Sequence, residues 1–135
     1  MLKTAHVVLL TLFLGIGTYS KADHTLPQGS LKRLSDDSRY LYYVVRNSSL
    51  HSGVKRAVND FTYKVDSMIR CAQSPDSREN TRDHDLLPEH CEHYLNYVHY
   101  SWYNVERYLW DTAYDYPYVY RAYLRVRTDM RDLPH

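Results

Sequence analysis

The sequence predicts an all-α domain, arranged as a small helical bundle of about four segments. Apolar residues recur at three- and four-residue steps in several separate stretches, which is the spacing of an amphipathic helix. No stretch shows the sustained two-residue alternation of a half-buried strand, and only RYLYYVV (39–45) has a composition that favours one. At 135 residues the chain is one domain at most. Four short amphipathic segments can shield a single core of this size.

The N-terminus has the features of an export signal. Lys3 precedes an apolar run at 7–18, and SKA (20–22) places small residues where a signal peptidase reads them. The run is too short to span a bilayer comfortably as a helix, and an uncleaved anchor is the alternative. We therefore expect a signal peptide (1–22), a flexible leader (23–30) and a single helical domain (31–135). The mature protein is then secreted or periplasmic, without a stable membrane anchor.

Removal of the signal peptide leaves a chain that is close to neutral. Lys3 and Lys21 are lost, so the count of lysine and arginine falls from 17 to 15 against 16 acidic residues. Nucleic-acid binders normally carry a basic excess, and so do proteins that dock on anionic membrane surfaces. The near-neutral charge argues against both classes, and we expect no nucleic-acid partner.

The two cysteines, Cys71 and Cys91, both lie in the exported part of the chain. In an oxidising compartment an even pair predicts a disulfide, here closing over the polar stretch SPDSRENTRDHD (74–85), which we expect to be an exposed loop. No CxxC spacing supports redox catalysis, and the absence of CxxCH excludes covalent attachment of a c-type haem.

Three helical stretches can be delimited from these patterns. The first begins at Leu31, and RNSSLHSG (46–53) ends it with residues that suit a turn and supply cap oxygens to the next helix. The second runs from Val54 to near Cys71. The third starts around LLPEH (86–90), where a proline is tolerated in the first turn.

The motif DYPY (115–118) interrupts the last helical pattern and leaves two readings open. Either a tight turn leads to a fourth helix, or one long helix is kinked near Tyr114. Proline disfavours helical geometry in the residue before it, but the apolar register continues past Pro117 and slightly favours the kink.

The third stretch has two different faces. One is an apolar seam with alternating steps of four and three residues: Cys91, Leu95, Val98, Trp102, Val105, Leu109 and Thr112. The opposite side is mostly aromatic: His93, Tyr97, Tyr100, Tyr103, Arg107, Trp110 and Tyr114. Tyrosine and tryptophan are enriched in binding surfaces because they combine a large flat area with a polar tip.

Two interpretations of the aromatic face remain. The first and fourth segments cover it, so that the rings belong to the core, or it stays open for a partner. On the second interpretation the binding residues are Tyr97, Tyr100, Tyr103, Arg107, Trp110 and Tyr114.

Histidines gather at the start of the third helix. His90 and His93 are three residues apart beside Glu89 and Glu92, a set that suits a weakly held divalent metal. The spacing HCEH is not HExxH, and a solvated helix start explains it as well. A non-covalent haem would draw its ligands from His99, Met68 and Met130, although methionines on apolar stripes usually belong to the core.

The sequon NSS marks Asn47 as a glycosylation acceptor in a turn, provided that the source is eukaryotic.

The sequence therefore favours a non-enzymatic secreted or periplasmic protein. It would bind a protein or peptide partner, or a second copy of itself, through the aromatic face. No GxSxG motif or glycine-rich phosphate loop points to catalysis. The alternative function is a small metal- or haem-binding protein that uses His90 and His93, and otherwise we expect no cofactor.

Overall fold

The computed structural model describes residues 24–74 and 86–135, and the expected signal peptide and most of the expected loop 74–85 lie outside these ranges. Within them the chain is an all-α bundle, as predicted. Its helices are α1 (Ser30–Arg46), α2 (Ser52–Ala72), α3 (Glu92–Thr112) and α4 (Pro117–Arg131). The 3₁₀ turns η2 (Glu89–Cys91) and η3 (Ala113–Asp115) precede and follow α3.

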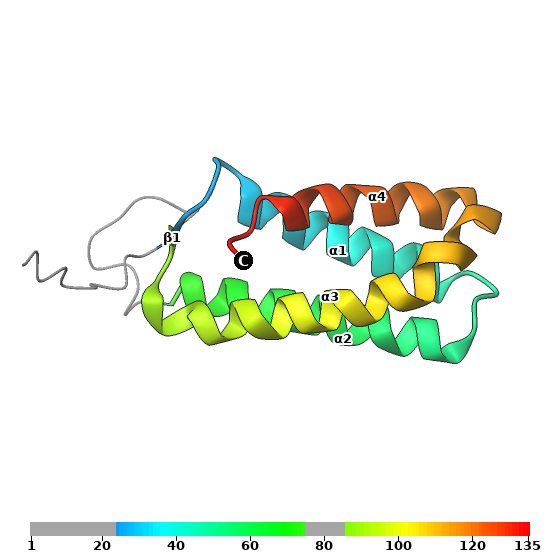
Figure 1. The fold of residues 1–135 in the computed structure, drawn as a ribbon, viewed down its shortest axis with the longest axis horizontal. Coiled ribbons are helices and arrows are strands. Elements are labelled where there is room, and N and C mark those ends of the chain that lie inside the picture. The colour runs from blue at the N-terminus through cyan, green and yellow to red at the C-terminus, as the bar shows by residue number, and fades with distance from the viewer. Residues whose placement is uncertain (1–23, 75–85) are drawn as a thin grey trace, which may run out of the picture.

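The four helices run side by side along the long axis of the molecule (Figure 1). α2 packs between α1 and α3, and α4 packs on α1. α3 and α4 also lie next to each other, but their backbones stay further apart, and large aromatic side chains bridge the space between them. The stacked rings of Trp102 and Tyr123 are one such bridge.

The predicted apolar stripes form the core. Leu34, Leu41, Val58, Phe61 and Val98 are fully buried, and so is Ser38, which lies on the same side of α1 as Leu34 and Leu41. The Ser38 hydroxyl donates to the Ser35 carbonyl oxygen at 3.0 Å, so its burial leaves no unpaired donor. One seam position was predicted wrongly: Thr112 is exposed, because α3 ends there and η3 turns Ala113 into the core instead.

The turn between α1 and α2 differs in its capping residue from the prediction. His51 is the N-cap of α2, and its Nδ1 accepts a hydrogen bond from the Gly53 amide at 3.0 Å. The serine of this turn closes α1 instead: Ser48 donates to the Val45 carbonyl oxygen at 2.6 Å and accepts from the Leu50 amide. A neutral histidine nitrogen can do the work of a serine or asparagine oxygen at this position.

The α3–α4 junction is a turn, and the alternative of one long kinked helix is wrong. Tyr116 has an extended backbone (φ −126°, ψ 86°), and Pro117 occupies the first position of α4. Proline excludes helical geometry from the residue before it, but costs nothing at a helix start, where no partner for its missing N–H exists. The unbroken apolar register across the junction reflects two helices that face the same core.

The segment expected as a flexible leader packs on the bundle over residues 24–30. β1 (His24–Thr25) pairs antiparallel with β2 (Leu86–Leu87). Leu26 is buried, and the Ser30 amide donates to the Pro27 carbonyl oxygen at 3.0 Å. The strand pairing, the buried Leu26 and this hydrogen bond together hold the stretch against the bundle.

The disulfide Cys71–Cys91 is confirmed, with an S–S distance of 2.06 Å. It ties the end of α2 to the start of α3. Cys91 is completely buried, so this end of the bundle is closed by a covalent link rather than by apolar packing alone.

Candidate functional site

The predicted division of α3 into two faces is confirmed. The seam residues Leu95, Val98, Trp102, Val105 and Leu109 are buried. The rings on the opposite side are all more than half exposed: Tyr97 53%, Tyr100 71%, Tyr103 59%, Trp110 53% and Tyr114 62%. Arg107 on the same side is exposed as well. We call these six side chains the aromatic face.

The two edges of the aromatic face contact neighbouring helices. Toward α2, the ammonium of Lys64 lies over the Tyr97 ring, 5.8 Å from its centroid. Toward α4, the guanidinium of Arg127 lies 5.1 Å from the centroid of the Trp110 ring. The interpretation that other helices cover the rings therefore holds only at the edges, since both rings stay more than half exposed.

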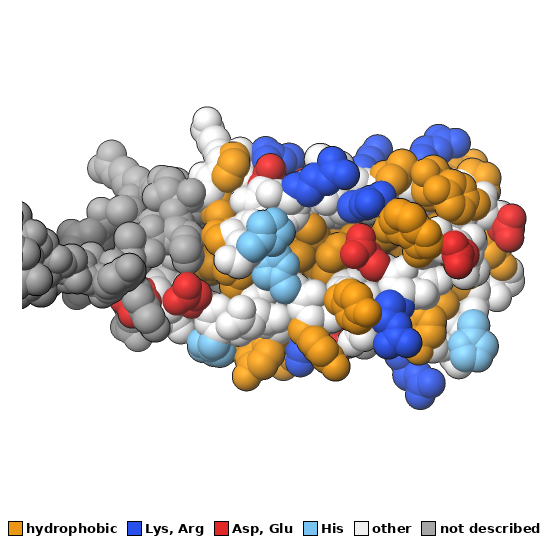
Figure 2. All heavy atoms as spheres, viewed as in Figure 1, with side chains coloured by type: hydrophobic (Ala, Val, Ile, Leu, Met, Phe, Trp, Pro, Cys, Tyr) orange, Lys and Arg blue, Asp and Glu red, His pale blue; other side chains and the backbone are white. Residues whose placement is uncertain are grey.

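The centre of the aromatic face has no partner among the residues that the structure describes. Tyr100 and Tyr103 make no side-chain hydrogen bond or ring contact with any residue in the part of the chain that the structure describes. Figure 2 shows the side of the molecule on which α3 and α4 lie, where hydrophobic side chains alternate with basic and acidic ones. Such a surface is amphipathic rather than uniformly hydrophobic. Its mixture of aromatic rings and arginines is typical of protein interfaces.

Beneath the Trp110 edge lies a buried aromatic contact that the sequence did not reveal. Tyr123 of α4 is buried against Trp102, and its hydroxyl donates to Glu106 Oε1 at 3.4 Å. Burial, together with the nearby Glu106 carboxylate, raises the pKa of Tyr123 to about 12. Glu106 also faces Arg127, at 3.8 Å between Oε1 and Nε. This cluster holds α4 against α3, so Tyr123 is a structural tyrosine.

The two histidines predicted to bind metal, His90 and His93, lie next to different residues. His93 stacks on Tyr94, with ring centroids 4.1 Å apart. His90 belongs, with Cys71 and Cys91, to the one group of three possible metal ligands in residues 24–74 and 86–135. Both sulfurs of that group are joined in the disulfide, so neither is available as a thiolate. A metal site at His90 and His93 stays a prediction.

The three residues considered as haem ligands pack in the core or contact another part of the chain. Met68 and Met130 are buried in the core. His99 Nε2 lies 2.6 Å from the Pro134 carbonyl oxygen.

Asn47, the predicted glycosylation acceptor, is exposed at the end of α1, and its amide donates to the Tyr43 carbonyl oxygen at 2.7 Å. Glycosylation there also stays a prediction.

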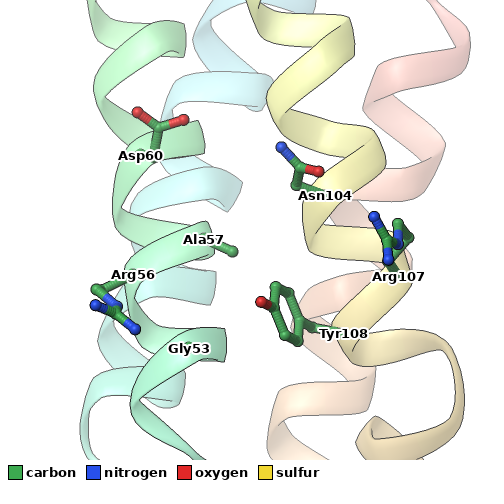
Figure 3. A pocket seen from close by; sticks show the side chains of 7 residues that line it. All are labelled: Gly53, Arg56, Ala57, Asp60, Asn104, Arg107 and Tyr108. Carbon is green, nitrogen blue, oxygen red and sulfur yellow. The ribbon is translucent and has the colours of Figure 1, made fainter.

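A groove of about 490 Å³ runs between α2 and α3, beside the aromatic face (Figure 3). α2 contributes Gly53, Arg56, Ala57 and Asp60 to it. α3 contributes Asn104, Arg107 and Tyr108. No sequence pattern identifies these residues in advance. The groove depends on how α2 and α3 pack together and on the small residues Gly53 and Ala57.

A second groove, of about 460 Å³, lies where the end of α1 meets the start of α4. Tyr40, Tyr43 and Tyr118 are among its lining residues. The guanidinium of Arg125 lies 5.7 Å from the Tyr40 ring centroid, and that of Arg121 lies 5.6 Å from the Tyr118 ring centroid. Two of the tyrosines of this groove, Tyr40 and Tyr118, thus already have cationic neighbours from the chain itself.

The chain matches no known family model, and no curated protein or solved structure is significantly similar to it. Among the described residues, none of the helices combines the length and apolar character required to cross a membrane.

Proposed function

We propose that this domain is a non-enzymatic, exported interaction module that binds a protein or peptide partner through the aromatic face. One observation carries the proposal: Tyr100 and Tyr103 are 71% and 59% exposed at the centre of the face and have no side-chain partner in the described chain. The α3 seam opposite them is already buried, so the fold does not need these rings for its core.

The chemistry of the face suits a protein partner. Tyrosine, tryptophan and arginine are the residues most enriched among those that dominate binding energy. Each ring offers a rigid flat surface and loses little rotamer freedom on binding. Binding would cover apolar area that water now contacts, at about 25 cal/mol for each Å² removed from water, before the cost of association is subtracted.

Two further observations support an exported module. The disulfide Cys71–Cys91 is typical of proteins that act in an oxidising compartment. The N-terminal pattern of Lys3, the apolar run and SKA (20–22) suits a signal peptide. The partner is either a different protein or a second copy of this chain.

The test is the triple variant Tyr100→Ala, Tyr103→Ala and Trp110→Ala. Its matched control removes two equally exposed rings from other helices, Tyr43→Ala and Tyr118→Ala, whose rings are 64% and 69% exposed. Both proteins should keep the helix content of the wild type by circular dichroism. Sedimentation velocity over a concentration series reports self-association, and co-purification from the extracellular fraction of the source, followed by mass spectrometry, reports a different partner.

The proposal predicts that the triple variant loses the complex while the control keeps it. If the triple variant unfolds, the rings belong to the core and the proposal fails. It also fails if both variants lose the complex equally, because the aromatic face would then have no special role.

A further inference from the structure

The groove between α2 and α3 carries an unbalanced positive charge. Asp60 is the only acidic lining residue, and it faces Lys64 on its own helix, at 3.7 Å between Oδ1 and Nζ. Arg56 and Arg107 line the same groove, and neither makes an ion pair, side-chain hydrogen bond or ring contact within the described chain. Two guanidinium groups and one carboxylate therefore line the groove, and that carboxylate already faces the ammonium group of Lys64.

Several other arginines of the bundle are paired with carboxylates. Arg39 lies 3.1 Å from Asp66, and Arg127 lies 3.8 Å from Glu106. Arg56 has a carboxylate four residues away on its own helix, at Asp60, but its guanidinium points toward the Gly53 end of the groove instead (Figure 3). The arginine and the acid of α2 thus occupy opposite ends of the groove.

Small side chains on α2 open the groove and let an aromatic ring enter it. A Cβ atom at Gly53 would lie 3.6 Å from Cε1 of Tyr108, so the ring of Tyr108 lies within van der Waals reach of the α2 surface at this position. Figure 3 shows this ring projecting from α3 toward α2. The volume of about 490 Å³ falls within the range of roughly 300–1,000 Å³ that is common for ligand sites.

We propose that this groove binds an acidic peptide segment, with one carboxylate held at Arg56, a second carboxylate held at Arg107 and the peptide backbone held at Asn104. Guanidinium groups bind carboxylates through paired, charge-assisted hydrogen bonds. The Asn104 amide both donates and accepts, as a peptide backbone requires. Asp60 at the other end accepts from peptide N–H groups and repels a uniform polyanion, so the groove selects an acidic peptide over a sulfated polysaccharide.

This site goes beyond the aromatic face, with which it shares only Arg107. The probe is the peptide acetyl-Gly-Glu-Glu-Gly-amide, titrated at millimolar concentration into the ¹⁵N-labelled full chain, and the dissociation constant is taken from the amide shifts. Its uncharged counterpart is acetyl-Gly-Gln-Gln-Gly-amide. Inorganic phosphate and a heparin-type oligosaccharide are titrated in parallel, at two salt concentrations.

We expect shifts at the groove residues, and binding at least about tenfold weaker for the glutamine peptide, since hydrogen bonds to charged groups are worth about that factor or more. Arg56→Gln and Arg107→Gln should each weaken binding of the glutamate peptide about as much. The matched controls Arg46→Gln and Arg131→Gln remove the same charge from exposed sites outside the groove and should change binding less than about twofold. Ala57→Leu fills the groove without changing its charge and should also block binding.

Three results would overturn the proposal. The first is an absence of groove shifts with the glutamate peptide. The second is equal weakening by Arg46→Gln or Arg131→Gln, which would mean that overall charge is responsible. The third is binding of phosphate or the oligosaccharide as tightly as the peptide, which would mean an unspecific anion site. Tyr100→Ala with Tyr103→Ala should leave the peptide affinity unchanged, so failure here and failure of the aromatic face are separable.

Discussion

Trp102 of α3 stacks on Tyr123 of α4, with ring centroids 5.5 Å apart and ring planes inclined by 21°. Trp102 also contacts Phe61 of α2, at 5.1 Å between centroids, and is 6% exposed. Eight residues further along the same helix, Trp110 is 53% exposed. One helix thus places one tryptophan in the core and the other at the surface.

The two tryptophans should therefore differ sharply in their contribution to stability. Trp102→Ala should lower the free energy of unfolding by about 3–5 kcal/mol, because it removes a ring from a packed core. Trp110→Ala should lower it by less than about 1 kcal/mol. Urea unfolding followed by circular dichroism measures both, and equal losses would contradict the two-faced arrangement of α3.

Asp129 should make the stability of the bundle depend on pH. It is 7% exposed, its Oδ2 has no hydrogen-bond partner, and its Oδ1 lies 3.8 Å from Nε of Arg33. Burial, with the neighbouring Asp37 and Asp132, raises the pKa of the Asp129 carboxyl to about 7 against the opposing effect of Arg33. The folded state then holds a proton that the unfolded chain releases at its ordinary pKa of 3.8. This stabilisation is complete below pH 3.8 and is lost as the pH rises through 7.

The variant Asp129→Asn isolates this effect, because its side chain is similar in size and does not titrate. Between pH 8 and pH 5 the wild type should gain about 1–3 kcal/mol of unfolding free energy relative to the variant. Denaturant titrations at several pH values provide the comparison. Parallel curves for the two proteins would mean that Asp129 is ionised throughout.

The disulfide should supply a large part of the stability. It closes a loop with a sequence separation of 20 residues, which corresponds to about 3 kcal/mol in the chain-entropy model. Cys71→Ser with Cys91→Ser should lower the free energy of unfolding by that amount while the helix content at low temperature is retained. A double variant as stable as the wild type would show that apolar packing alone holds the ends of α2 and α3 together.

Gly29 should resist substitution because of its backbone geometry. It is the N-cap of α1 and has a positive φ of 76°, a conformation that side chains disfavour. Gly29→Ala should therefore cost about 1–2 kcal/mol. Ser35→Ala, a change within the same helix, should alter stability by less than about 0.5 kcal/mol, and a cost at Gly29 no larger than this would be evidence against the left-handed geometry.

The sequence predicted the helices and their buried faces because that information is local. The stripe from Val54 to Met68 and the seam from Leu95 to Leu109 follow from helical periodicity alone, and burial confirms both. The turn at Pro117 was harder, because the apolar register that continued past it is compatible with either geometry. Only the extended backbone of Tyr116 distinguishes the two.

The sequence could not predict which helices pack against each other. It therefore could not predict the groove between α2 and α3 or the burial of Asp129. Arg56 and Arg107 become neighbours only because α2 packs on α3. Asp129 looks like one more exposed acid of a helix end, and its burial depends on how α4 packs on α1. The aromatic face was predictable as a pattern, but the contacts of its edges with Lys64 and Arg127 required the neighbouring helices to be in place.

Site-specific photo-cross-linking tests the central claim most directly. A benzophenone amino acid replaces Tyr103 at the centre of the aromatic face or, as the control, Tyr43 on α1, in the full chain expressed in its source cells. We predict a discrete cross-linked complex from position 103 and none from position 43. The same adduct from both positions, or none from position 103, would contradict a binding role for the aromatic face.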